Sequence, residues 1–181
     1  MAEQVPLAWQ RVGVRHERDY KIFQTRTLDV TDPRNGAPYV RTVIHAPDWV
    51  NVVPVTVNDE VVLVRQFRFG TWSNTLEIPG GMLDAGEDAL AAASRELEEE
   101  TGYRPAKVTP LGVSNPNPAI FDNRLHTFLA EGCVRVHDGR PDASEDLQVV
   151  VVPRQELRAL VTRGEITHSL VLAALLFESW R

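Results

Sequence analysis

Residues 81–103 read GMLDAGEDALAAASRELEEETGY and carry the strongest structural signal in the chain. The alanine-rich part predicts a helix from Asp88 to about Thr101. Asp88 is a good N-cap residue, because its side-chain oxygen can accept hydrogen bonds from unpaired N–H groups of the first turn. Gly102 should end the helix, since glycine readily takes the left-handed conformation found at helix C-termini. The stretch therefore predicts a glycine-containing loop that leads into one well-delimited helix.

The second half of this helix carries a group of acids. Glu96, Glu99 and Glu100 lie three and four residues apart and share one helix face, whereas Glu98 points away. Acids are unfavourable here, because the C-terminus of a helix carries partial negative charge. One explanation is a solvated acidic helix, since charge runs usually lie at the surface. The other is a site for a hard cation such as Mg²⁺, Mn²⁺ or Ca²⁺, which prefers carboxylate oxygens.

The spacing around the helix favours the cation site. It resembles the Nudix box, G-x5-E-x7-R-E-U-x-E-E-x-G-U, in which U is a bulky apolar residue. Such a long pattern at fixed spacing is far more specific than a short motif. The last position is aromatic rather than aliphatic, which is a mild departure. The matching residues are Gly81, Glu87, Arg95, Glu96, Leu97, Glu99, Glu100, Gly102 and Tyr103.

This resemblance implies a Nudix α/β/α sandwich with a mixed central sheet, and hydrolysis of a nucleoside diphosphate linked to another moiety. It also implies Mg²⁺, with Mn²⁺ as an alternative, because divalent cations neutralise a pyrophosphate and activate water. Arg95 is placed among the catalytic residues, and its guanidinium can pair with Glu87 and hold the loop against the helix. The implied metal ligands in this region are the Gly80 carbonyl and the carboxylates of Glu96, Glu99 and Glu100.

The flanking segments point to a branch of the family. Residues 64–68, VRQFR, and 76–81, LEIPGG, resemble the pyrophosphatases of ADP-ribose and nucleoside diphosphate sugars. Gly80 stands where that branch usually has Ala, which should matter little if only its carbonyl is used. The branch places Arg68, Glu77 and an arginine near Arg41 in the substrate cleft, and the planar fork of arginine suits phosphate. The alternative is that Arg68 merely lies on a solvated strand face.

Further candidates follow the helix. Pro118 matches a proline of the branch, but the surrounding SNPNPAIFDNR, residues 114–124, departs from its usual Pro-Gly stretch, so the sugar can differ. Arg124 is a candidate for binding sugar hydroxyls. Glu145 matches an acidic loop that supplies a metal ligand or a general base. Because the branch often has a second acid where this chain has Ala143, Glu99 remains an alternative general base.

The N-terminal part resembles the arm of the same branch, in which an aromatic side chain stacks on the base. Phe23, Tyr20 and Trp49 are candidates, and base stacking is typically worth ~1–3 kcal/mol. His45, His126 and His168 are interpreted as structural. We expect residues 1–45 to form a β arm used for dimerisation and residues 46–181 to form the Nudix hydrolase domain, so a homodimer is predicted.

Composition narrows the function classes. The 181 residues include 19 Lys and Arg against 25 Asp and Glu, which gives a formal charge of −6 and argues against RNA binding. The single cysteine, Cys133, excludes an intramolecular disulfide and favours a reducing compartment. The N-terminus lacks the apolar segment of a signal peptide, and no apolar run is long enough for a bilayer. We therefore expect a cytoplasmic protein without a membrane partner.

Secondary-structure patterns predict an α+β fold, because strands dominate the first half without strand–helix alternation. Helices are expected at residues 88–101, 155–162 and 167–179. Strands are expected at 20–31, 39–46, 51–57, 60–68, 75–78, 108–113, 125–130 and 147–152, with a hairpin turn at Asn58-Asp59.

The resulting prediction is Mg²⁺-dependent hydrolysis of ADP-ribose or a nucleoside diphosphate sugar to a nucleoside monophosphate and a sugar phosphate. The alternatives are a Nudix hydrolase of dinucleoside polyphosphates or RNA 5′ ends, and a non-catalytic nucleotide sensor with the same fold. A purely structural acidic helix would leave the spacing of Gly81, Glu87 and Gly102 unexplained.

Overall fold

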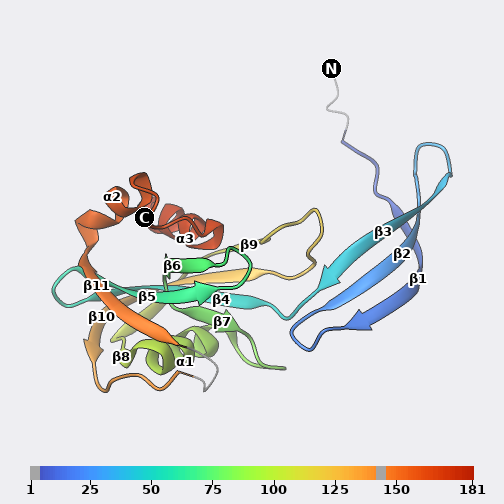
Figure 1. Cartoon of the computed structure of the whole chain (residues 1–181). Helices are drawn as coiled ribbons and strands as arrows, with labels where there is room; N and C mark the ends of the chain where they lie inside the picture. Colours follow the sequence, from blue (N-terminus) through green and yellow to red (C-terminus); the bar gives the residue numbers. More distant parts are fainter. Residues whose placement is uncertain (1–4, 142–145) are drawn as a thin grey trace. The chain divides into compact units, whose positions relative to one another are not determined.

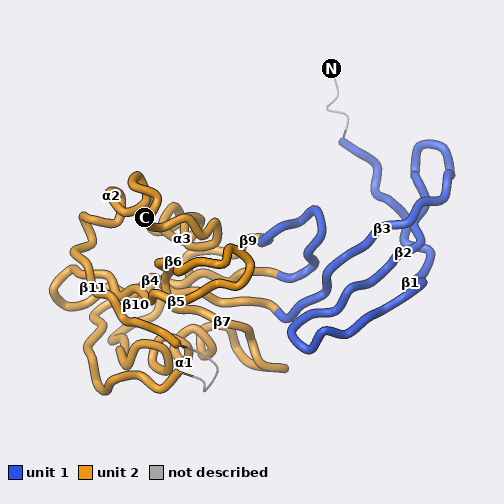
Figure 2. Tube along the Cα trace, in the orientation of Figure 1, with its two compact units in different colours: residues 1–47, 115–123 blue, residues 48–114, 124–181 orange. Residues whose placement is uncertain are grey.

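The computed structural model describes residues 5–141 and 146–181, which form two compact units (Figure 2). Unit 1 contains the chain up to Pro47 together with Asn115–Asn123. Unit 2 contains Asp48–Ser114 and Arg124–Arg181. The prediction that residues 1–45 serve as a dimerisation arm stays a prediction.

Unit 1 is built on an antiparallel sheet of three strands in the order β1-β2-β3: β1 (Gln10–Asp19), β2 (Gln24–Thr31) and β3 (Pro38–His45). The strands β2 and β3 were expected, whereas β1 was not. Its sequence, QRVGVRHERD, is mostly polar and nearly every residue is exposed, so it lacks the alternation of a half-buried strand. The segment 115–123 joins the unit through a hydrogen bond from the Ile44 N–H to the Ile120 carbonyl, 2.7 Å long.

Unit 2 contains a mixed sheet of eight strands. The central path runs β11-β5-β4-β10-β8, with β6 beside β5, β7 beside β4 and β9 beside β10. The pair β4 and β10 is parallel, while the other pairs are antiparallel. The strands are β4 (Trp49–Thr56), β5 (Glu60–Arg68), β6 (Ser73–Glu77), β7 (Gly80–Met82), β8 (Tyr103–Arg104), β9 (Lys107–Ser114), β10 (Leu125–Arg135) and β11 (Leu147–Pro153).

Helices cover both faces of this sheet (Figure 1). The helix α1 (Ala89–Thr101) packs through Ala92, Ala93 and Leu97 on one face, against valines of β4 and Phe128. The short helix η1 (Arg154–Glu156), α2 (Leu157–Thr162) and α3 (Ser169–Ser179) lie at the other face, where α2 and α3 contribute apolar side chains to a second core cluster. The predicted mixed α+β sandwich is confirmed. Every helix in the described residues is too short or too polar to cross a membrane.

The boundaries of α1 follow the sequence signals. The Asp88 side chain accepts hydrogen bonds from the N–H groups of Leu90 and Ala91 at 3.0 and 3.1 Å. Gly102 has φ +73° and donates its N–H to the Glu98 carbonyl at 2.8 Å, which ends the helix in the left-handed conformation. The helix is thus capped at both ends, and its acidic face has a defined position against β7.

Candidate active site

The acidic end of α1 lies against the two glycines of β7. Glu100 is only 4% exposed, and its Oε2 accepts the N–H of Gly80 at 3.2 Å. A Cβ atom added to Gly81 would lie 2.4 Å from Glu96 Oε1, so a side chain there would displace the carboxylate. The absence of side chains at Gly80 and Gly81 therefore allows two helix carboxylates to approach the backbone of β7 directly.

Gly80 has a stricter requirement than the sequence suggested. An added Cβ would lie 2.3 Å from the Val50 carbonyl oxygen and 2.9 Å from the Cα of Asn51, which are backbone atoms of β4. The expectation that Ala would be nearly equivalent to Gly80 is wrong for this backbone. Because Asn51 and Gly80 are register partners, Ala would require β7 to move away from β4.

Arg95 binds the carboxylates that surround it. Its Nε and Nη2 donate to the two oxygens of Glu87 at 2.9 and 3.0 Å. Its Nη1 donates to Glu96 Oε1 and Glu99 Oε2 at 2.9 and 3.0 Å. The hydrogen bonds from Arg95, supported by the Asp84 N–H, lower the pKa of Glu87 to about 2. The bonds from Glu87, with the nearby Glu96 and Glu99, in turn raise the pKa of Arg95 above its ordinary value. The pairing of Arg95 with Glu87 ties the loop before α1 to the helix.

Three consecutive acids of α1 have different surroundings. Glu100 is buried, whereas the side chain of Glu99 is 50% exposed. Glu98 faces elsewhere and forms a fork with Arg104, with its Oε1 2.6 Å from Nη2. The Arg104 hydrogen bond is the main cause that lowers the pKa of Glu98. Glu98 is thus a structural acid beside two acids that face β7 or Arg95.

The oxygens near β7 have the chemistry that a hard divalent cation needs. Glu96 and Glu100 are one helical turn apart, and both approach the Gly80-Gly81 backbone. Within residues 5–141 and 146–181, no three His, Cys, Asp or Glu side chains are placed together to enclose an ion. Arg95 Nη1 instead bridges Glu96 and Glu99. The donor set fits a cation in type, because carboxylate oxygens are the ligands that such an ion prefers.

Two further predicted residues, Arg68 and Glu77, bind each other. Arg68 Nε and Nη2 donate to Glu77 Oε1 and Oε2 at 2.9 and 2.8 Å. Glu77 is 3% exposed, and Thr75 Oγ1 donates to its Oε1 at 2.6 Å. Burial raises the pKa of Glu77, but the hydrogen bonds from Arg68 and Thr75 outweigh it, so the pKa lies below its usual value. Thr75 was missed by the sequence analysis, although its position two residues before Glu77 on the same strand face was a usable signal.

In unit 2, Trp49 is the first residue of β4, and Arg124 directly precedes β10, which pairs with β4. The Trp49 N–H donates to the Arg124 carbonyl at 2.8 Å, and the Arg124 N–H donates to Asp48 Oδ1 at 2.8 Å. His126 Nε2 lies 3.1 Å from Asp48 Oδ2. Burial alone would raise the pKa of Asp48. The hydrogen bonds from the Arg124 N–H and from His126 outweigh burial, so the pKa lies below its usual value. These contacts give Asp48 a structural part in connecting β4 to β10.

The remaining described candidates belong to unit 1. The Arg41 guanidinium lies over the rings of Tyr39 and Trp9, 4.9 and 5.2 Å from their centroids. Phe23 is stacked on Tyr20 with a centroid distance of 5.0 Å. Pro118 is exposed in the segment 115–123. Glu145 lies outside the described residues.

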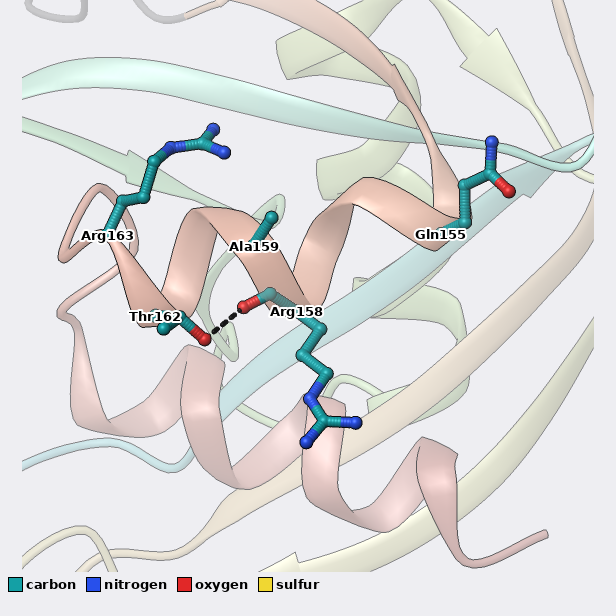
Figure 3. A pocket seen from close by; sticks show the side chains of 5 residues that line it. All are labelled: Gln155, Arg158, Ala159, Thr162 and Arg163. Atoms are coloured by element: carbon teal, nitrogen blue, oxygen red, sulfur yellow. Dashed lines mark hydrogen bonds between the residues drawn. The ribbon is translucent and has the colours of Figure 1, made fainter.

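A hollow on the surface of η1 and α2 offers a contrast (Figure 3). It contains the side chains of two arginines and no carboxylate, and Thr162 Oγ1 donates to the Arg158 carbonyl at 2.8 Å. A divalent cation therefore finds no acidic ligand there. The residues that line it are Gln155, Arg158, Ala159, Thr162 and Arg163.

Comparisons with known proteins agree with this geometry. A model of the NUDIX domain matches residues 47–175. The ADP-ribose pyrophosphatase of Bacillus subtilis (strain 168) is 34% identical over 147 residues, which cover 81% of this chain and 79% of that protein. The GDP-mannose pyrophosphatase of Citrobacter koseri is 34% identical over 160 residues, which cover 82% of each protein. A crystal structure of an ADP compounds hydrolase has a TM-score of 0.85 at 24% identity, covering 98% of this chain and 96% of that one, which shows a shared fold.

The family match extends over both core clusters of unit 2 and includes the whole acidic helix. It confirms the resemblance that was read from residues 81–103, and with the relatives it confirms a pyrophosphohydrolase. Nudix hydrolases generally use divalent metal cations, which agrees with the oxygen ligands beside β7. Motif, fold and relatives converge, and the chain belongs to the NUDIX domain family.

Proposed function

We propose that the protein hydrolyses the pyrophosphate bond of ADP-ribose or of a nucleoside diphosphate sugar, with Mg²⁺ as cofactor. Water adds across the P–O–P linkage, and the products are a nucleoside monophosphate and a sugar phosphate. The observation that carries the proposal is the contact of Glu96 and Glu100 with the glycine backbone of β7. Relatives named for ADP-ribose and for GDP-mannose support this substrate class and leave the base open.

The acids of α1 and the carbonyl of Gly80 are proposed to hold the cation. When bound, Mg²⁺ neutralises the charge of the pyrophosphate and lowers the pKa of a water molecule. Glu100 has its place set by the Gly80 N–H, and Glu96 by Arg95 Nη1. Arg95 is proposed to act by arranging these carboxylates, because its fork also fixes the preceding loop through Glu87.

Two residues compete for the role of general base. Glu99 is half exposed, and its Oε2 accepts a hydrogen bond from Arg95 Nη1 at 3.0 Å. Glu145 is the other candidate and also a proposed metal ligand. The base must accept a proton from the attacking water within hydrogen-bond reach. The two roles are separable by the kinetics of single variants.

Arg68 and Glu77 are proposed to bind substrate as a pair. The Arg68 side chain is 43% exposed while its guanidinium is held by the buried Glu77 carboxylate. A planar guanidinium suits phosphate or ribose oxygens.

In unit 1, Arg41, Phe23 and Pro118 stay candidates for substrate contacts, as do Trp49 and Arg124 in unit 2. The homodimer and the cytoplasmic location also stay predictions.

A substrate panel tests the proposed function. ADP-ribose, GDP-mannose, other nucleoside diphosphate sugars, dinucleoside polyphosphates and RNA with a 5′ triphosphate are each incubated with Mg²⁺, and phosphate is measured after coupling to a phosphatase. We expect the sugar-linked diphosphates to have the highest kcat/KM, with loss of activity in EDTA and recovery with added Mg²⁺. A preference for polyphosphates or RNA, or nucleotide binding without turnover, would contradict it.

A further inference from the structure

The hydroxyl of Thr75 forms a short hydrogen bond inside the β5–β6 hairpin. Thr75 is 9% exposed, and its Oγ1 lies 2.6 Å from Glu77 Oε1. Thr75 and Glu77 are two residues apart on β6, so their side chains share one face of the sheet. Arg68 joins them from β5, since it is paired with Ser73 in the same register. Three side chains thus meet on one face of the hairpin.

The shared acceptor is Glu77 Oε1, which receives Arg68 Nε at 2.9 Å as well as the Thr75 hydroxyl. Glu77 Oε2 receives Arg68 Nη2 at 2.8 Å. The two bonds of the fork align the carboxylate with the guanidinium, and a further hydrogen bond from a fixed side chain restricts rotation of the carboxylate about its own bonds. The Thr75 hydroxyl supplies a third hydrogen bond to this carboxylate, from a residue other than Arg68, in a buried place where competing water is scarce.

We propose that Thr75 is a positioning residue for substrate binding: its hydroxyl orients the Glu77 carboxylate, and Glu77 holds the Arg68 guanidinium that binds the substrate anion. This inference rests on the proposed function, because it takes Arg68 as a substrate ligand. Thr75 itself touches neither substrate nor reacting atoms. Its loss should therefore weaken binding through Arg68 and leave the chemical step nearly unchanged.

The first test compares steady-state kinetics of Thr75→Val and Thr75→Ser. Val keeps the branched shape and removes the hydroxyl, so KM for the best substrate should rise about 3- to 10-fold, as expected for one lost hydrogen bond, with kcat within about 2-fold. Ser restores the hydroxyl and should restore KM. Thr75→Ala removes the same hydroxyl with a different change of shape and should give the same increase in KM.

Thr127→Val is the matched control. Thr127 is 1% exposed on β10, and its hydroxyl has no hydrogen-bond partner among the described residues. The same exchange of hydroxyl for methyl should leave KM and kcat unchanged there. A rise in KM for Thr127→Val equal to that of Thr75→Val would show a general packing effect and overturn the proposal.

The second test observes Arg68 in the substrate-free protein. The Arg68 Nε–H signal in ¹H–¹⁵N spectra, assigned by its absence in Arg68→Lys, should shift and exchange faster with water in Thr75→Val but not in Thr75→Ser. An unchanged signal overturns the proposal whatever the enzyme's substrate is. An unchanged KM in Thr75→Val, alongside a raised KM in Arg68→Ala, overturns it while leaving Arg68 as a substrate ligand. An unchanged KM in Arg68→Ala removes both the substrate role of Arg68 and this inference.

Discussion

Arg95 and Arg68 bind a glutamate through the same fork but in different surroundings. Each donates Nε and Nη2 to the two oxygens of one carboxylate, at 2.9 and 3.0 Å for Glu87 and at 2.9 and 2.8 Å for Glu77. The Glu87 side chain is 17% exposed in the loop before α1, whereas that of Glu77 is 4% exposed in the sheet. The same contact geometry therefore occurs in a partly exposed and in a buried setting.

The two pKa values show what this difference means. For Glu87, the hydrogen bonds from Arg95 are the largest influence and lower its pKa to about 2. For Glu77, burial is the largest influence and raises the pKa, and the hydrogen bonds must overcome it before the pKa falls below the usual value. Leaving Glu77 without partners would therefore be more costly than leaving Glu87 without them. We interpret Arg95 as a residue that positions the neighbouring carboxylates. We interpret Arg68 as the proposed substrate ligand, which the buried Glu77 carboxylate holds in place.

The largest loss of activity should come from substitution of an acid on α1, the helix that carries Arg95. Glu100→Gln keeps an oxygen that can accept the Gly80 N–H but removes the charge of a proposed metal ligand. We expect kcat to fall at least about 100-fold at saturating Mg²⁺, with Tm unchanged or slightly raised, because like-charge repulsion on the helix falls. Steady-state kinetics and thermal unfolding check this. Glu98→Gln is the matched control, and it should retain activity within a few-fold. Activity near wild type in Glu100→Gln would contradict the ligand assignment.

The next effect separates the two candidate bases. Glu145→Gln should lower kcat about 100-fold, within the usual contribution of general bases, with a smaller change in KM. Glu99→Gln should have a weaker effect on kcat than Glu145→Gln, because Glu99 is half exposed and its amide oxygen can still accept the hydrogen bond from Arg95. The measurement is kcat and KM for both variants over a range of pH. If only Glu99→Gln loses activity, the general base lies on α1.

The helix α1 and the loop before it could be predicted from the sequence, because the signals that define them are local. Asp88, Gly102 and the period of the acids define α1 without knowledge of the rest of the fold. The pairing of Arg95 with Glu87 was also predictable, since the motif places them eight residues apart across one loop. The mixed sheet and its two helical layers followed from the order of strands and helices and from the family resemblance.

The buried fork was less predictable because it depends on the register of two strands. Arg68 and Glu77 were named as neighbours of the substrate, but their mutual bond follows from the pairing of Val64 with Glu77 in β5 and β6. The clash behind Gly80 likewise depends on how closely β7 approaches β4. Such distances are set by tertiary packing, which residue patterns do not encode.

The third effect tests Arg68 itself. Arg68→Ala should raise KM about 10- to 100-fold, as expected for a lost charge-assisted contact, with a smaller change in kcat. Arg68→Lys should recover little, because the ammonium group lacks the planar fork. Arg65→Ala, on the same strand but opposite face, is the control and should leave KM unchanged. Steady-state kinetics on the best substrate decides, and an unchanged KM in Arg68→Ala would remove Arg68 from the site.

The smallest effect concerns the contribution of the Arg95–Glu87 pair, which is partly exposed, to the stability of the fold. The pKa of Glu87 is lowered from 4.5 to about 2 in the folded protein. Because the Glu87 pKa is lower in the folded than in the unfolded protein, its ionised carboxylate stabilises the fold at pH values above the unfolded-state pKa. This contribution is lost as pH falls from about 5 toward 2. Glu87→Gln should therefore reduce Tm at neutral pH, by at most about 4 °C because the pair is near the surface, and the difference should vanish near pH 2.

Thermal unfolding from pH 7 to pH 2 measures this convergence. Glu165→Gln removes another surface carboxylate, one that pairs with Arg163, and it corrects for the change in net charge. Arg95→Lys should give a curve close to that of Glu87→Gln, because it removes the fork from the other side. Parallel curves for wild type and Glu87→Gln would show that the Arg95 fork contributes nothing to acid stability. In that case the Arg95–Glu87 pair would serve only to hold Arg95 where it positions Glu96 and Glu99. Loss of the pair would then lower kcat and leave Tm unchanged.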